Sequence, residues 1–167
     1  MTLYEKLSLL IGAVTVLVIS AQLYWIYRSF KADHERRKKQ ATIEFGKTVF
    51  EDVERCQKAL FRRFSNKVIN LGDLNEDEDW QNARDLMANL EMLAAGVNTG
   101  IYDIEIVDRM FGSLIITMNK KMGPYVDHQR DGGKYPTVFS EFTTMAQKIW
   151  NRRNPGNKGG EIKHSNV

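Results

Sequence analysis

The feature that most constrains the fold is an uncharged apolar run close to the N-terminus. Residues Leu7 to Ile26 contain no Asp, Glu, Lys or Arg, and about 20 helical residues are the length that crosses the hydrocarbon core of a bilayer. In lipid, a single span satisfies its backbone hydrogen bonds only as a helix. The sequence therefore predicts a transmembrane helix over residues 7–27, preceded by a short extracytoplasmic N-terminus of residues 1–6.

The charges on either side of this run predict its orientation. Glu5 and Lys6 precede it, whereas a group of cations follows it: Arg28, Lys31, Arg36, Arg37, Lys38 and Lys39. Cations gather on the cytoplasmic side of a membrane span, so we expect the N-terminus outside and the rest of the chain in the cytoplasm, at a bacterial inner membrane. The alternative is a cleaved signal peptide, in which the cations precede the apolar run. Ile19-Ser20-Ala21 is also a poor cleavage site.

Residues 28–152 have the pattern of a cytoplasmic helical domain. Apolar residues recur at three- and four-residue spacing in four stretches, which is the period of an amphipathic helix. The stretches are Phe45–Phe64, Ala83–Val97, Ile104–Met122 and Phe139–Trp150. The predicted fold is therefore all-α, with a single transmembrane helix that continues into a bundle of about four helices. Residues 153–167 are poor in apolar side chains, and we expect a disordered tail there.

Capping residues indicate where the predicted helices begin and end. Asp103 is a typical N-cap for the third stretch, and Pro136 suits the first turn of the last one. Gly96, Asn98 and Gly100 offer the left-handed conformation that ends a helix, here the second.

The sequence carries no recognisable motif for catalysis, for a metal ion or for a cofactor. Its three histidines, His34, His128 and His164, lie on separate segments, and Cys56 is the single cysteine. No zinc-ligand spacing and no glycine-rich phosphate loop is present. The acidic run from Asp73 to Asp79 lacks the glycine and glutamate of a calcium loop. We therefore expect a protein that is not an enzyme and that has no catalytic residues, metal ligands or cofactor.

Basic residues are the candidates for ligand binding. The membrane-proximal run Arg36, Arg37, Lys38 and Lys39 is expected to set the topology and to attract anionic membrane lipid. Further cations lie near predicted helix ends or in the Gly132-Gly133-Lys134 loop, and together they are the candidate site for an anion. They are Arg62, Arg63, Lys67, Lys120, Lys121 and Lys134. A nucleotide second messenger is one such anion, whereas duplex nucleic acid is not expected. The alternative is a solvated surface, because helix C-termini favour cations in any case.

Small and polar residues in the apolar run favour self-association. Gly12, Ala13 and Ala21 allow close approach of helices, and Ser20 and Gln22 can hydrogen-bond across an interface. We therefore expect a homo-oligomer.

The stretch Arg36 to Phe45, RRKKQATIEF, resembles an uncharacterised bacterial family. Its members have one N-terminal membrane helix and a compact helical cytoplasmic domain of unknown function. The likeness continues through Leu90–Val97, Gly100–Asp103 and Phe139–Trp150. The resemblance implies this architecture and no particular activity.

Two functions are compatible with these patterns. The first is a membrane-anchored, non-catalytic interaction or sensor module that binds a protein partner or another copy of itself. The second is an oligomeric, ligand-gated effector that disrupts the membrane, because compact bacterial anti-phage proteins, including cyclic-nucleotide and CRISPR-linked ones, look similar in layout. A basic pocket at a symmetric interface would distinguish the second from the first.

Overall fold

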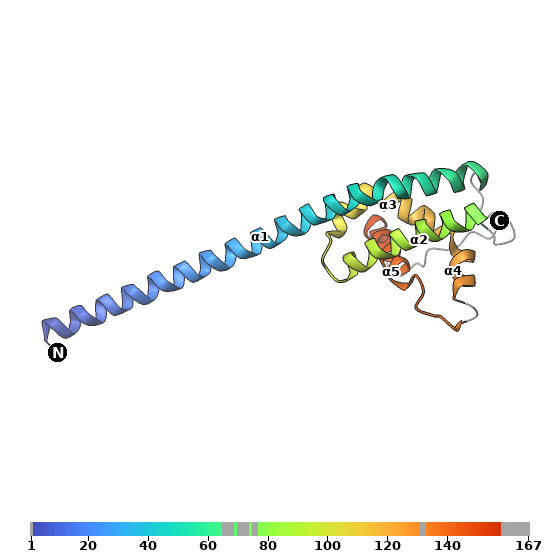
Figure 1. The fold of residues 1–167 in the computed structure, drawn as a ribbon. Coiled ribbons are helices and arrows are strands. Elements are labelled where there is room, and N and C mark those ends of the chain that lie inside the picture. The colour runs from blue at the N-terminus through green and yellow to red at the C-terminus, as the bar shows by residue number, and fades with distance from the viewer. Residues whose placement is uncertain (1, 65–68, 70–73, 75–76, 131–132, 158–167) are drawn as a thin grey trace. The chain divides into compact units, whose positions relative to one another are not determined.

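The computed structural model describes residues 2–64, 69, 74, 77–130 and 133–157, and these residues are helical almost throughout. The helices are α1 (Leu3–Phe64), α2 (Asp77–Asn98), α3 (Ile104–Lys121), α4 (Gly123–Gln129), α5 (Ser140–Arg153) and the short 3-10 helix η3 (Pro155–Asn157) (Figure 1). The described part of the chain contains no strand. The predicted all-α fold is confirmed. The chain divides into two compact units, Met1–Lys38 (unit 1) and Lys39–Val167 (unit 2).

Unit 1 is the N-terminal part of α1, and its apolar side chains are exposed. An 18-residue window of the helix has a mean hydropathy of 2.1, and none of that window is buried. Leu17, for example, is 69% exposed. By length and composition, this is the one described helix that can cross a membrane.

Unit 2 contains the rest of α1 together with α2, α3, α4 and α5, and it has a single apolar core. Helix α5 packs against both α2 and α3. Each of the longer helices contributes one apolar face, as the three- and four-residue spacing predicts. The largest fully buried side chains include Leu60 from α1, Leu86, Met87 and Leu90 from α2, Ile115 and Met118 from α3, and Phe142 and Met145 from α5. Cys56 is in the same core, and burial raises the pKa of its thiol.

The N-terminus of α3 is capped as the sequence predicts. Asp103 has an extended backbone, and its side chain accepts hydrogen bonds from the N–H groups of Glu105 and Ile106. The N–H of Asp103 itself donates to Oγ1 of the buried Thr42 at 2.8 Å. Helix α1 and the start of α3 are thus joined by a buried polar contact.

The N-terminus of α5 lies later than predicted. Pro136 is in a turn, and α5 begins at Ser140. The residue before it, Phe139, has a left-handed backbone with φ 55°, which interrupts any helix started at the proline. The prediction that Pro136 opens this helix was therefore wrong.

The glycines at the end of α2 have two different roles. Gly100 has φ +82° and takes the predicted left-handed position. Gly96 and Asn98 instead remain helical, so that part of the prediction was wrong. Gly96 is buried against the ring of Tyr102, with no room for a Cβ atom.

The end of the chain is described only in part. Arg153 is the last residue of α5, and Pro155–Asn157 form η3. The remainder of the predicted disordered tail, residues 158–167, lies outside the described residues.

Candidate functional site

An open groove lies in unit 2 where α1 ends and α2 begins, with a volume of about 1080 Å³. It contains two residues of the predicted anion site, Arg62 and Arg63. The groove is lined by Gln57, Lys58, Ala59, Phe61, Arg62 and Arg63 from α1, and by Glu78, Asp79 and Asn82 from α2.

Arg63 compensates a carboxylate that is largely buried. Its Nη1 atom lies 2.6 Å from Oδ2 of Asp79, whose side chain is only 9% exposed. Asp79 is in the first turn of α2, where the helix dipole also favours negative charge. The ion pair with Arg63 therefore stabilises the buried Asp79 carboxylate where α1 packs against α2.

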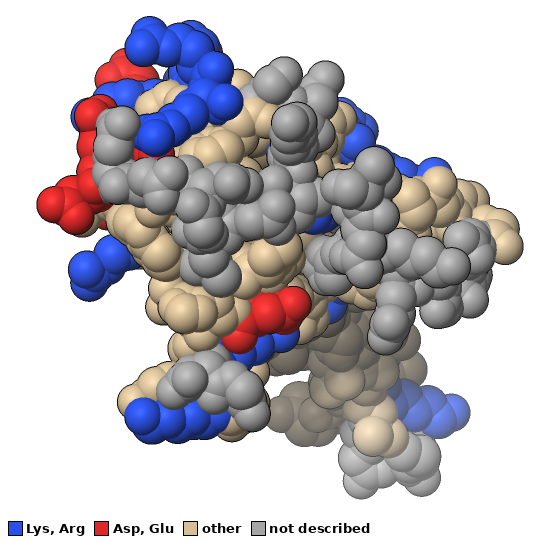
Figure 2. Space-filling model, turned by 90° about the vertical axis from the view of Figure 1, so that its right-hand side faces the viewer, with Lys and Arg blue, Asp and Glu red and all other residues tan. Residues whose placement is uncertain are grey.

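The groove carries charge of both signs. Lys58 pairs with Glu54 of its own helix at 2.7 Å, and Arg62 is exposed one turn further on. The carboxylates of Glu78 and Asp79 line the same space. Figure 2 shows this end of unit 2, where Lys and Arg side chains form several separate groups and Asp and Glu side chains lie directly beside the largest of them. A groove of this kind suits a partner with mixed charge better than a polyanion.

The two lysines at the end of α3 point to different aromatic rings. Lys121 Nζ lies 4.0 Å from the centre of the Phe61 ring, and Lys120 Nζ lies 5.0 Å from that of Trp150 in α5. Burial lowers the pKa of Lys121. Lys121 therefore contacts Phe61, one of the residues that line the groove, whereas Lys120 lies against α5.

The remaining cations of the predicted anion site lie elsewhere. Lys134 is exposed in the segment before α5, 5.2 Å from the ring centre of Tyr135. Lys67 lies outside the described residues. Among the residues that the structure describes, no group of three or more His, Cys, Asp or Glu side chains is arranged to hold a metal ion.

The end of the RRKKQATIEF stretch makes specific contacts within unit 2. Thr42 is the buried acceptor for the N–H of Asp103, and the Phe45 ring stacks on Tyr102 with a centroid distance of 4.8 Å. The stretch therefore fixes the α2–α3 junction against α1.

The family described as "Domain of unknown function (DUF4760)" matches residues 8–149, which includes most of the apolar segment of α1, this stretch and most of α5. The chain belongs to this family. The resemblance to an uncharacterised family is thereby confirmed. The comparison with curated proteins gave no match, and neither did the comparison with solved structures.

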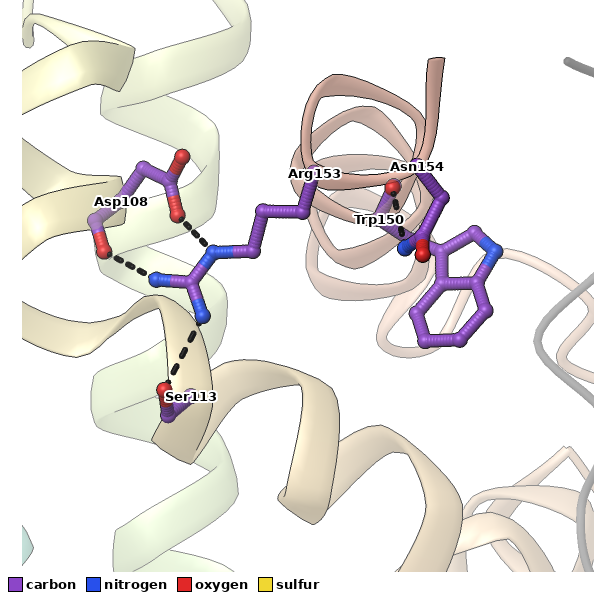
Figure 3. Close-up of polar contacts among 5 residues, drawn as sticks. All are labelled: Asp108, Ser113, Trp150, Arg153 and Asn154. Carbon is purple, nitrogen blue, oxygen red and sulfur yellow. Dashed lines mark hydrogen bonds and ion pairs between the residues drawn. The ribbon is translucent and has the colours of Figure 1, made fainter. Parts of the chain in front are cut away.

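A second polar cluster in unit 2 was not predicted. Arg153, at the end of α5, donates from Nε to Oδ1 of Asp108 at 2.6 Å, from Nη2 to the Asp108 carbonyl oxygen and from Nη1 to Oγ of Ser113 (Figure 3). A Cβ atom at Gly112 would overlap with Asp108 and Arg153, so the glycine makes room for this contact. Arg153 is the first residue of the predicted tail, and the sequence does not indicate this contact because its partners Asp108 and Ser113 lie 45 and 40 positions earlier.

Replacing Arg63 of the DUF4760 domain by alanine is expected to lower the free energy of unfolding by about 1 kcal/mol, because Asp79 then loses its cation, although the pair is weakened by solvent at Arg63, whose side chain is 35% exposed. Arg62→Ala is the matched control, and we expect a change within about 0.5 kcal/mol because Arg62 is exposed. Denaturant unfolding of the full chain in detergent, followed by circular dichroism, measures both. Equal losses for the two variants would show that the ion pair with Asp79 does not stabilise the fold.

Proposed function

We propose that this protein is a membrane-anchored, non-catalytic interaction module that holds unit 2 at the cytoplasmic face of the inner membrane. One observation carries the proposal. The exposed apolar segment of unit 1 and the buried core residues Val53, Cys56 and Leu60 of unit 2 belong to the same helix, α1. The chain therefore uses one element both for anchoring and for folding, which supports attachment of the domain to the membrane.

The distribution of charge supports the orientation. Arg28 and Lys31 follow the apolar segment directly and are exposed, and more cations follow them on α1. On the other side, the described residues before Leu7 include one cation, Lys6. By the positive-inside rule, the N-terminus lies outside and unit 2 lies in the cytoplasm.

The mixed charge of the groove between α1 and α2 supports the proposal that the partner is a protein, either a different protein or a second copy of this chain. Cationic Arg62 and anionic Glu78 can each pair with an opposite charge on a protein surface. The carboxylate of Glu78 in the same groove would weaken the binding of a nucleotide messenger, which is the ligand that a gated defence effector would require. The charge of the groove therefore favours the interaction module over the effector.

Membrane anchoring is tested by carbonate extraction of membranes from cells that express the full chain. We expect the wild type in the membrane pellet. Val16→Lys with Leu17→Lys is expected to move most of the protein to the soluble fraction, because each lysine at the centre of a span costs about 3 kcal/mol. The matched control is Met92→Lys with Ile101→Lys, at exposed apolar positions of unit 2, and it should stay in the pellet. A wild-type chain in the soluble fraction would refute the proposal.

The partner class is tested by a photo-crosslinking residue at Arg62 in the full chain, with the same residue at the exposed Lys47 as the control. A discrete protein adduct from position 62 alone supports the interaction module. Binding of a cyclic oligonucleotide to the purified chain, lost in Arg62→Glu, would instead support the effector.

A further inference from the structure

The cations that follow the apolar segment lie mainly on one side of α1. At about 100° of rotation per residue, Arg28, Lys31, Arg36 and Lys38 fall within an arc of about 160°. We refer to these four residues as the basic face. Glu35 is the acidic residue within the same arc, so the basic face has a clear excess of positive charge.

The opposite side of the helix is electrically balanced. Arg37 points there, and its Nε atom lies 2.8 Å from Oδ2 of Asp33. Both side chains are exposed, so this ion pair forms a neutral counterpart to the basic face. A cation distribution that served topology alone would not need to be one-sided, since the positive-inside rule counts charges regardless of their direction.

An interfacial aromatic residue lies on the same side as the cations. Trp25 falls within the arc, and the guanidinium carbon of Arg28 lies 6.0 Å from its ring centre. Trp25 is 66% exposed. Tryptophan favours the headgroup level of a bilayer, and its position next to Arg28 places the start of the basic face at that level.

The distances along the helix match a lipid surface. At about 1.5 Å per residue, Arg28 lies about 3 Å and Lys31 about 8 Å beyond Ile26, which is the depth of the headgroups. Arg36 and Lys38 lie about 15–18 Å beyond it, which is about 8–13 Å beyond the headgroups and about one Debye length or slightly more from the charged surface. A membrane helix is tilted by about 20° on average. A tilt towards the basic face brings Arg36 and Lys38 closer to the headgroups.

We infer that the basic face binds the phosphate groups of anionic lipids in the leaflet that the chain enters. The inference rests on the proposed membrane anchoring and adds a lipid preference to it. The basic face would thereby select anionic over zwitterionic lipid around the protein and fix the direction in which the helix tilts.

The full chain in nanodiscs of phosphatidylcholine with about 30% phosphatidylglycerol tests this inference. Electron paramagnetic resonance of spin-labelled lipids measures how strongly each lipid associates with the protein. We expect the wild type to prefer phosphatidylglycerol several-fold, and the preference should largely disappear at about 1 M NaCl, where charges are screened within about 3 Å. Because both faces of a nanodisc have the same lipid composition, a change in topology does not affect the result.

The decisive variant replaces Arg28, Lys31, Arg36 and Lys38 by glutamine. Its preference for phosphatidylglycerol over phosphatidylcholine should fall at least about three-fold relative to the wild type. The matched control removes the same number of cations elsewhere, through glutamine at Arg37, Lys47, Arg55 and Lys58, and should keep the preference. Equal losses in the two variants would overturn the inference. So would a preference that about 20 mM inorganic phosphate abolishes at constant ionic strength, because the ligand would then be free phosphate. If the wild type enters nanodiscs without any lipid preference, only the proposed lipid binding by the basic face is refuted. If it fails to enter them, the proposed membrane anchoring is refuted as well.

Discussion

Replacing Gly96 by alanine is expected to lower the free energy of unfolding of unit 2 by about 2 kcal/mol. The new Cβ atom would overlap with the ring of Tyr102, and overpacking of this kind costs about 3 kcal/mol at its upper range. The gain in helix propensity from glycine to alanine offsets about 1 kcal/mol. Tyr102 has little room to move away, because its N–H donates to the Gly96 carbonyl oxygen at 2.9 Å and its ring stacks on Phe45.

The matched control for this prediction is Gly46→Ala, the same change at another buried glycine within a helix. Its Cβ atom would lie 2.8 Å from Cε of Met110, the flexible end of a long side chain. We expect a loss of less than about 1 kcal/mol because Met110 can change rotamer. Denaturant unfolding of the full chain in detergent measures both variants. If Gly96→Ala is as stable as the wild type, Tyr102 does not pack against Gly96 as described.

A double-mutant cycle identifies the clash directly. Tyr102→Ala alone is expected to destabilise the domain because it removes the stack on Phe45. In the background of Tyr102→Ala, the substitution Gly96→Ala should cost little, because the ring that it meets is gone. If the losses of the two substitutions are strictly additive, the destabilisation by Gly96→Ala does not come from a clash with the Tyr102 ring.

The parts of the fold that sequence reasoning predicted are those determined by neighbouring residues. Apolar spacing depends on positions three and four apart, and the Asp103 cap depends on the next two or three N–H groups. Both were confirmed. Gly96 was misassigned because glycine serves both left-handed turns and close packing, and only the position of Tyr102 distinguishes the two uses.

The candidate site was less predictable because its contacts join residues far apart in the sequence. Arg63 was grouped with Arg62 as an anion ligand, but its partner is Asp79 on the next helix. Lys120 and Lys121 were also grouped, although a rotation of about 100° per residue directs neighbouring helix positions to different surroundings. Adjacent cations in a sequence therefore do not by themselves define a shared pocket.

The second large effect on the free energy of unfolding is expected at Glu91. Its carboxylate lies on α2 but caps the N-terminus of α5. From α2, it accepts hydrogen bonds from the backbone N–H groups of Glu141, at 3.2 Å, and Phe142, at 2.7 Å, in the first turn of α5. Phe139 provides no side-chain cap. The carboxylate therefore satisfies two N–H groups that α5 leaves without a helical partner and places negative charge at the positive end of the helix dipole.

Glu91→Ala should lower the free energy of unfolding by about 2 kcal/mol, because charge-assisted hydrogen bonds contribute about 1.5–3 kcal/mol. Glu91→Gln should lose roughly half as much, since the amide oxygen still accepts one hydrogen bond but carries no charge. Glu51→Ala, at an exposed position of α1, is the control and should change stability by less than about 0.5 kcal/mol. Hydrogen exchange adds the local measurement: in Glu91→Ala, the amides of Glu141 and Phe142 should exchange faster than those in the middle of α5. Uniform acceleration throughout α5 would mean that Glu91 acts through packing rather than as a cap.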